Sequence, residues 1–145
     1  MLVVAGTVVA GETCTSESCG TKSKDKSVQN VEELSTDQLK ALLASESAPV
    51  VLDARTGKFD DGRRIPGAKS LNAGSSAEEV QAVVADKHTP VVTYCSNLKC
   101  PASAQLAAHL RKLGYTNVKE YPQGIEGWVE AGHPVVETKP APAAP

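Results

Sequence analysis

Short runs of apolar residues alternate along the chain with stretches in which apolar residues recur at helical spacing. Two runs, at residues 49–53 and 91–94, are almost entirely apolar and are bounded by proline or polar residues. Runs of this length and composition are typical of strands buried on both faces of a parallel sheet. Shorter strands are predicted at residues 31–34, which suits a sheet edge, at 68–72 and at 117–121.

Two segments begin with the spacing of a capping box, in which a serine precedes a glutamine or glutamate by three residues. The pairs are Ser35 with Gln38 and Ser75 with Glu78. We therefore expect helices over residues 36–45 and from residue 75 to about residue 87. The intervening residues 56–67 contain several turn signals and two cations, Arg63 and Arg64, and they predict a long loop with little regular structure.

The longest helical pattern begins at Pro101, whose fixed φ suits a first helical position. Its apolar stripe consists of Ala102, Leu106, Leu110 and Leu113. Gly114 supplies the residue that commonly ends a helix, and a shorter helix is predicted at residues 124–131. This order of elements predicts an α/β fold with a mostly parallel sheet covered by helices.

The chain has 145 residues, of which 41% are hydrophobic, and this suits one domain with its own core. We place that domain at residues 31–136. An apolar leader and a polar, flexible linker are expected over residues 1–30, and a Pro/Ala-rich tail over residues 137–145.

The leader is too short to span a bilayer, which takes about 20 residues. It resembles the end of the hydrophobic region of a signal peptide, without the basic start. Export to the periplasm is the expectation, and a cytoplasmic extension is the alternative.

The formal net charge of −2 and the pI near 5.9 argue against nucleic acid and anionic membranes as partners. We expect a monomer that acts on small molecules or proteins, without a membrane span, metal or cofactor. Four cysteines form two pairs with four intervening residues, Cys14/Cys19 and Cys95/Cys100. A four-thiolate metal site is disfavoured, because the first pair lies in a polar linker and zinc pairs usually sit on a tight turn.

Cys95 lies between the end of a predicted strand and the start of the longest helix. Helix N-termini carry unsatisfied N–H groups and a partial positive charge, so a loop at this place stabilises an anion, either a thiolate or a bound oxyanion. This is the setting of a reactive cysteine. Asp53 and Arg55 end the other buried strand. We expect them to form a structural pair that supports the loop, with contact between Arg55 and substrate as the alternative.

Five motifs in this chain resemble those of the single-domain rhodaneses, a sulfurtransferase family. The motifs are Val-Leu-Asp-Ala-Arg at 51–55, Gly-Arg-Arg-Ile-Pro-Gly-Ala at 62–68, Tyr94 with Cys95, the helical segment 106–115, and Gly-Ile-Glu-Gly-Trp at 124–128 followed by Ala-Gly-His-Pro at 131–134. The resemblance covers about residues 31–136. It implies a rhodanese-like fold, with a five-stranded, mostly parallel sheet flanked by helices on both faces.

The resemblance also implies that Cys95 is the nucleophile and carries a persulfide between two half-reactions. The backbone N–H groups of the loop are then expected to face inward as a persulfide cradle that also binds substrate. The loop residues are Ser96, Asn97, Leu98, Lys99 and Cys100. Together with the helix terminus they are expected to lower the thiol pKa from about 8.5 towards neutrality, so that no metal or general base is required.

Two positions depart from the family pattern. Arg64 stands where relatives commonly have a non-catalytic histidine, and Cys100 where many carry an arginine late in the loop, so Lys99 is the one loop cation. A phosphatase is disfavoured, because the corresponding loop of phosphatases in this family is one residue longer and ends in an arginine, which this loop lacks. Cys100 is a resolving thiol, a second sulfur acceptor, or a small residue that fills space.

We therefore hypothesise a thiosulfate sulfurtransferase that passes sulfur from thiosulfate or a similar donor, through Cys95, to a thiophilic acceptor. The acceptor is cyanide, a thiol or the cysteine of a partner protein. The alternative is a persulfide-carrying or redox-sensing binding module that uses Cys95 and Cys100 without efficient turnover.

Overall fold

The computed structural model describes residues 31–139. The expectations for the leader, for Cys14 and Cys19, and for residues 140–145 lie outside the described residues. Export therefore stays a prediction.

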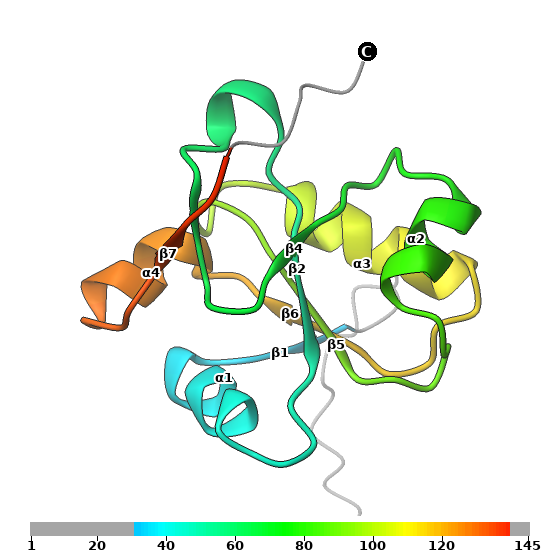
Figure 1. Cartoon of the computed structure of the whole chain (residues 1–145), viewed down its shortest axis with the longest axis horizontal. Coiled ribbons are helices and arrows are strands. Elements are labelled where there is room, and N and C mark those ends of the chain that lie inside the picture. Colours follow the sequence, from blue (N-terminus) through cyan, green and yellow to red (C-terminus); the bar gives the residue numbers. More distant parts are fainter. Residues whose placement is uncertain (1–30, 140–145) are drawn as a thin grey trace, which may run out of the picture.

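The central sheet has five parallel strands in the order β1-β6-β5-β2-β4, which confirms the predicted fold class (Figure 1). The strands are β1 (Glu32–Glu33), β2 (Val50–Asp53), β4 (Lys69–Ser70), β5 (Val91–Tyr94) and β6 (Val118–Tyr121). The two apolar runs, β2 and β5, lie side by side at the centre. Every residue of β5 is buried, as expected for a strand covered on both faces.

Four α-helices cover the sheet, two on each face, so that two separate clusters of buried side chains form (Figure 1). The helices are α1 (Thr36–Leu43), α2 (Ala77–Val83), α3 (Ala102–Lys112) and α4 (Gly124–Glu130). Side chains of α2 and α3 join one cluster, which includes Cys95, and those of α1 and α4 join the other. Within β2, Leu52 packs in the first cluster and Val51 in the second, because successive residues of a strand point to opposite faces.

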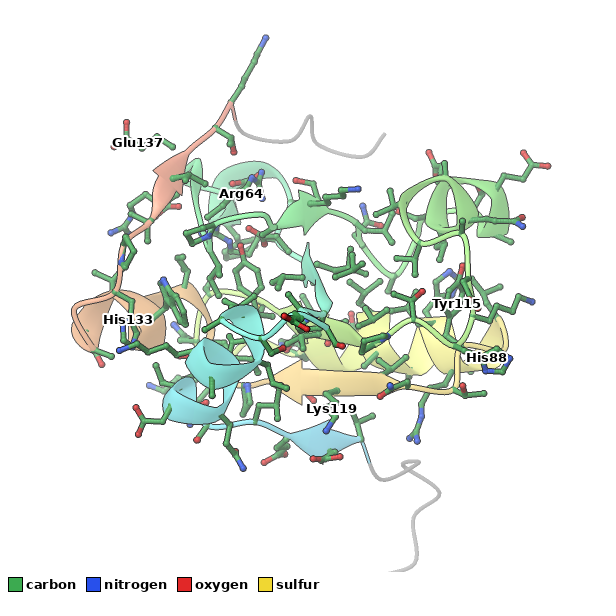
Figure 2. All side chains as sticks on the ribbon, turned by 60° about the horizontal axis from the view of Figure 1, so that its bottom comes forward. Arg64, His88, Tyr115, Lys119, His133 and Glu137 are labelled. Carbon is green, nitrogen blue, oxygen red and sulfur yellow. The ribbon has the colours of Figure 1, made fainter. Side chains whose placement is uncertain are left out.

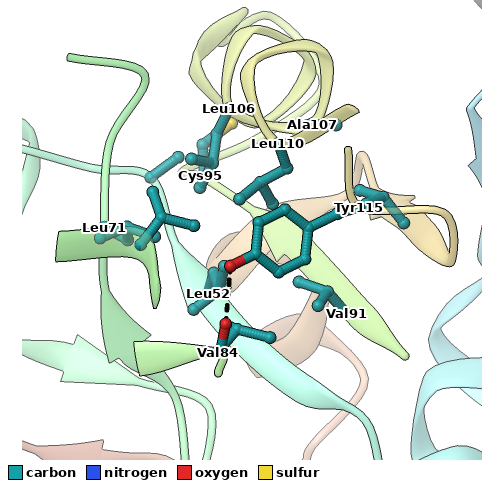
Figure 3. Packing of buried hydrophobic residues seen from close by; sticks show 12 residues of the cluster. Leu52, Leu71, Val84, Val91, Cys95, Leu106, Ala107, Leu110 and Tyr115 are labelled. Atoms are coloured by element: carbon teal, nitrogen blue, oxygen red, sulfur yellow. Dashed lines mark hydrogen bonds between the residues drawn. The ribbon is translucent and has the colours of Figure 1, made fainter. Parts of the chain in front are cut away.

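Figure 3 shows the first cluster from close by, with Tyr115 at its centre. The Tyr115 hydroxyl donates a hydrogen bond of 2.6 Å to the carbonyl oxygen of Val84, at the end of α2. Cys95 lies in the same cluster beside Leu106. The side chain of Cys95 is therefore part of the hydrophobic core between the sheet and helices α2 and α3.

The first predicted capping box is confirmed, since the Ser35 side chain and Gln38 bond each other's backbone N–H groups. The second box is displaced by one residue, to Ser76 with Glu79. Ser75 instead closes a turn, where its hydroxyl accepts from the N–H of Asn72. Both serines have the required spacing to a glutamate, so the sequence pattern alone could not separate the two registers.

A second, two-stranded sheet corrects the prediction that residues 56–67 have little regular structure. Strand β3 (Arg63–Arg64) pairs antiparallel with β7 (Val136–Glu137), and a 3-10 turn covers Gly57–Phe59. The N–H of Thr138 donates to the carbonyl oxygen of Gly62 at 2.7 Å, so regular pairing continues past residue 136. The partner strand lies far along the chain, and local turn signals carry no information about it.

Candidate functional site: a buried thiol at the carboxyl edge of the sheet

The Cys95 loop is held by hydrogen bonds from α4. The N–H of Ile125 donates to the carbonyl oxygen of Cys95 at 2.9 Å, and the N–H of Glu126 donates to that of Ser96 at 3.0 Å. This close approach requires glycine at position 124, where φ is +63° and a Cβ would lie 2.5 Å from the Cys95 carbonyl oxygen. Gly124 thus lets the start of α4 dock directly on the loop.

The Cys95 side chain is enclosed, and its residue exposure is 0%. Three acceptors lie within reach of the single thiol proton. They are the carbonyl oxygen of Cys100 at 3.2 Å, the hydroxyl of Ser103 at 3.5 Å and the carbonyl oxygen of Asn97 at 3.6 Å. In this arrangement the loop presents carbonyl groups to the thiol.

The expectation that all N–H groups of residues 96–100 face the thiol is wrong for two of them. The N–H of Lys99 donates to the Asn97 side chain, and the N–H of Cys100 donates to the Asn97 carbonyl, both at 3.0 Å. Asn97 therefore folds the loop on itself, as Asn side chains commonly do in turns. The N–H that acts on the thiol belongs to Ser103, in the first turn of α3.

Burial raises the pKa of the Cys95 thiol, and the neighbouring Cys100 thiol acts in the same direction. The hydroxyl and the N–H of Ser103 oppose this rise but do not overcome it. The predicted lowering of the pKa is therefore wrong for this arrangement of the loop. Burial disfavours the charged form of a group, and here it is the largest influence on the pKa of Cys95.

Cys100 is half-buried and packs against the same cluster as Cys95, and both cysteines are free thiols. The Cys100 thiol lies near enough to influence the titration of Cys95. This proximity is compatible with each of the three roles considered for Cys100.

Asp53 and Arg55 form the predicted structural pair, with 2.8 Å between the Arg55 Nη2 and the Asp53 Oδ2. The remaining donors of Arg55 are used on Asp61, at 2.8 Å, and on the carbonyl oxygen of Arg63. Burial alone would lower the pKa of Arg55, but its bonds to Asp53 raise it, so the guanidinium stays charged. With every donor group engaged inside the protein, Arg55 acts as support for the fold.

Arg64 completes this buried network and was not predicted to do so. It is 3% exposed and contacts both Asp53 and Asp60 at 2.6 Å. The sequence signal that could have found it is the acidic pair Asp60 and Asp61, four and three residues before Arg64, which offers partners for buried arginines.

Tyr94 connects this network to the reactive loop. Its hydroxyl donates to Asp53 at 2.9 Å and accepts from the N–H of Ile65 at 3.3 Å. Burial and the Asp53 charge raise the pKa of Tyr94, so the phenol keeps its proton. Since Tyr94 directly precedes Cys95, the network fixes the strand end that carries the thiol.

A pocket of about 290 Å³ opens beside the loop. Its lining comes from the loop and α4, namely Asn97, Leu98, Lys99, Gln123, Glu126, Gly127 and Glu130. Asn97 donates to Glu126 at 3.0 Å across the pocket, and Leu98 is 72% exposed at the rim. One cation and two carboxylates thus line this pocket beside the Cys95 loop.

The family model described as Rhodanese-like domain matches residues 35–131. The chain belongs to the rhodanese-like domain family. A search of curated proteins gave no match.

Solved structures with the same fold include a protein from Bacillus halodurans, with 27% identity, a TM-score of 0.65, and coverage of 78% of this chain and 82% of that one. Thiosulfate sulfurtransferase from Pseudomonas aeruginosa gives 22% identity and a TM-score of 0.60 over 79% of this chain, and this rhodanese-like domain spans only 22% of its length. A rhodanese with anions from E. coli has 25% identity and a TM-score of 0.51, over 63% of this chain and all of its own. The resemblance seen in the sequence motifs is confirmed at the level of family and fold.

Two further findings concern the part of the chain that the structure describes. Across residues 31–139, no three side chains of His, Cys, Asp or Glu gather in a way that could hold a metal ion. None of the helices in that range has the length and apolar character needed to cross a membrane.

Proposed function

We propose that this rhodanese-like domain is a sulfurtransferase that uses Cys95 to move sulfane sulfur from thiosulfate or a similar donor to a thiophilic acceptor. The observation that carries this proposal is the position of the thiol, which lies at the end of the central strand and against the first turn of α3. The hydroxyl and N–H of Ser103 there favour a negatively charged sulfur.

In the first half-reaction, the Cys95 thiolate attacks the outer sulfur of thiosulfate. A sulfur–sulfur bond forms on Cys95, the bond to the sulfonate sulfur breaks, and sulfite leaves with the electron pair. In the second half-reaction, cyanide or a thiolate attacks the outer sulfur of the persulfide, and the Cys95 thiolate is released. The E. coli rhodanese of similar fold was solved with anions, which supports an anionic donor.

Both half-reactions require the loop to change shape. Cys95 is fully enclosed, and the carbonyl oxygens of Asn97 and Cys100 occupy the space around its sulfur. An anionic persulfide would be repelled by those oxygens. Rotation of the loop peptides would open the site and turn N–H groups towards the sulfur, as the predicted cradle requires.

A second candidate function is a persulfide-carrying or redox-sensing module. The position of Cys100, beside Cys95 and in place of a cation, favours it. Attack of the Cys100 thiolate on Cys95 persulfide would form a Cys95–Cys100 disulfide and release hydrosulfide. A thiol reductant would then be required for each new cycle.

The two functions are separated by a thiosulfate and cyanide assay combined with intact-mass measurement on wild type, Cys95→Ser and Cys100→Ser. We expect wild type to form thiocyanate over many turnovers and to gain the mass of one sulfur atom with thiosulfate alone, and Cys95→Ser to do neither. Full activity in Cys95→Ser would refute the proposal. Sulfur uptake without turnover in wild type, with a longer-lived persulfide in Cys100→Ser, would establish the carrier function instead.

A further inference from the structure

A chain of hydrogen bonds leads from the Cys95 thiol to a carboxylate on the neighbouring strand β6. The Cys95 Sγ lies 3.5 Å from the Ser103 Oγ, and the Ser103 Oγ donates to the Glu120 Oε1 at 2.7 Å. Ser103 is 1% exposed, whereas Glu120 is only half-buried. The path therefore runs from an enclosed thiol to a carboxylate with access to solvent.

The direction of these bonds follows from the donors available. A serine hydroxyl has one proton, and that of Ser103 is used on Glu120, because a carboxylate offers only acceptors. The lone pairs of the Ser103 Oγ then face the thiol, which can donate to them. Of the three acceptor atoms around the thiol, the Ser103 Oγ is the one that is itself hydrogen-bonded to a carboxylate.

The fold holds both residues in place. Thr93 of β5 donates to the carbonyl oxygen of Ser103 at 3.1 Å, which fixes the first turn of α3 against the sheet. Thr93 is also in register with Glu120 of β6, so their side chains lie on the same face of the sheet. The strand pair thus presents Glu120 to Ser103.

We propose that Ser103 and Glu120 form a proton relay that activates Cys95, with Glu120 acting through Ser103. The proposal rests on the proposed function, in which Cys95 must become a thiolate. The S–H bond of Cys95 breaks as its proton passes to the Ser103 Oγ, and the Ser103 proton passes to the Glu120 Oε1. The products are a thiolate that accepts a hydrogen bond from Ser103, and a neutral carboxylic acid that releases its proton to water.

Such a relay meets a specific requirement of this site. The backbone carbonyl oxygens of Asn97 and Cys100 accept hydrogen bonds, but they cannot take a proton from a thiol at neutral pH. Burial also keeps water from the Cys95 sulfur. Glu120 is the carboxylate that can receive the proton without opening of the loop.

Other charged and titratable groups lie near the relay, on β1, β6 and the Cys95 loop. On β1, Glu33 is in register with Glu120, and Glu32 pairs with Lys119 of β6 at 2.8 Å (Figure 2). The first turn of α3 carries no acidic residue, and the loop contributes the Cys100 thiol and Lys99. Among these groups, Glu120 is the one with a hydrogen bond to Ser103.

The test is the single-turnover rate of Cys95 persulfide formation from thiosulfate, followed by intact mass between about pH 6 and about pH 9. We expect Glu120→Gln and Ser103→Ala each to slow the reaction at least about tenfold at neutral pH and to move the pH profile to higher pH. Glu120→Asp and Ser103→Thr, which keep the carboxylate and the hydroxyl, should recover part of the rate. The double variant should be no slower than either single one, because both cut the same path.

Glu33→Gln is the matched control, since it removes a carboxylate in register with Glu120 but outside the path. A wild-type rate and pH profile in Glu120→Gln, or additive losses in the double variant, would overturn the relay. Alkylation of Cys95 by iodoacetamide, located by peptide mapping, provides a readout that needs no sulfur donor. If alkylation depends on Glu120 but thiosulfate gives no persulfide in wild type, the relay stands and the proposed function fails.

Discussion

At the scale of single residues, the candidate site depends on how closely the backbone around Cys95 is packed. Carbonyl oxygens of the loop contact the thiol, and the start of α4 contacts the loop. The residue that permits the second contact is Gly124, because any Cβ at this position would collide with the Cys95 carbonyl.

Gly124→Ala should abolish most sulfur transfer, because the loop must move away from α4. Gly132→Ala is the matched control, since Gly132 also has positive φ, +76°, but open space around its Cα. Both variants should lose about 1 kcal/mol of unfolding free energy from backbone strain. Gly124→Ala should lose more, because its Cβ would also collide with backbone atoms of the Cys95 loop, and only Gly124→Ala should lose activity. Urea unfolding and the thiosulfate assay measure the two effects, and equal activities in the two variants would contradict the prediction.

The raised pKa of Cys95 makes stability depend on pH. Above the ordinary thiol pKa of about 8.5, the unfolded chain loses the Cys95 proton while the folded chain keeps it. The unfolded state then binds fewer protons, so the free energy of unfolding falls as pH rises through this window. The contribution of Cys95 is fully present below about pH 8.

Urea unfolding of wild type and Cys95→Ala between about pH 7.5 and about pH 9.5 measures this effect. The upper limit stays below the ordinary tyrosine pKa of about 10. We expect the wild type to lose stability more steeply across the window than the variant. Parallel curves for the two proteins would show that the folded thiol titrates as it does in the unfolded chain.

At the scale of secondary-structure elements, buried ion pairs connect β2, β3 and the turn between them. Asp53 is 0% exposed and accepts from Arg55, Arg64 and Tyr94. Asp61 also forms an ion pair with Arg55, but the Asp61 side chain is 39% exposed. Removing one partner of a buried ion pair leaves the charge of the other partner uncompensated. When an exposed partner is removed, water solvates the remaining charge instead.

Asp53→Asn should therefore reduce the free energy of unfolding by about 3 kcal/mol. Asp61→Asn, the matched control, should reduce it by less than about 1 kcal/mol. Urea unfolding near neutral pH compares them. Similar losses in both variants would mean that the buried cluster contributes no more than a surface pair.

The pocket between the loop and α4 predicts an electrostatic effect on substrate choice. Glu126 and Glu130 line this pocket, with Lys99 as the one cation of the lining. A dianionic donor that enters the pocket on its way to the loop would be repelled by both carboxylates. Glu126 also holds Asn97, so Glu130 is the position where charge can be changed without disturbing a loop contact that the structure shows.

Glu130→Gln should raise kcat/KM for thiosulfate about two- to fivefold at low ionic strength, because a repulsive charge is removed. The gain should shrink near about 0.5 M salt, where charges are screened. Glu78→Gln, an exposed carboxylate on α2, is the control. An equal gain from both substitutions would show a general charge effect instead of one at the pocket.

At the scale of the whole molecule, the sheet order determines where the site lies. From β2 the chain continues to β4 on one side and then to β5 on the other, so the crevice at the carboxyl ends falls between β2 and β5. Asp53 and Cys95 lie at these two strand ends. The small β3–β7 sheet closes the fold around the Asp53 network, because Thr138 accepts from Arg64 at 2.6 Å.

A chain that ends at residue 135 should therefore be less stable than one that ends at residue 139. It loses β7 and leaves the buried Arg64 without the Thr138 acceptor, and we expect a loss of about 2 kcal/mol. Thermal and urea unfolding of the two truncated chains test this. Equal stabilities would place the end of the domain before β7.

Much of this architecture could be predicted from sequence because the deciding information is local. The apolar runs of β2 and β5, the capping box at Ser35 and the stripe of α3 each specify an element by the spacing of a few residues. The order of those elements then restricts the topology to a parallel sheet covered on both faces. The sequence also predicts Cys95 as the reactive cysteine for the same reason, since the end of a strand and the start of a helix flank it.

Only the tertiary structure decided what surrounds that thiol. The sequence places Cys95 near a helix N-terminus, which lowers a thiol pKa, but burial and the neighbouring Cys100 thiol raise the pKa of Cys95. The contacts of Cys95 with Ser103, and of Ser103 with Glu120, depend on the register between strands and the packing of α3. Burial and register arise from residues far apart in the chain, and so local spacing predicts the nucleophile but not its environment.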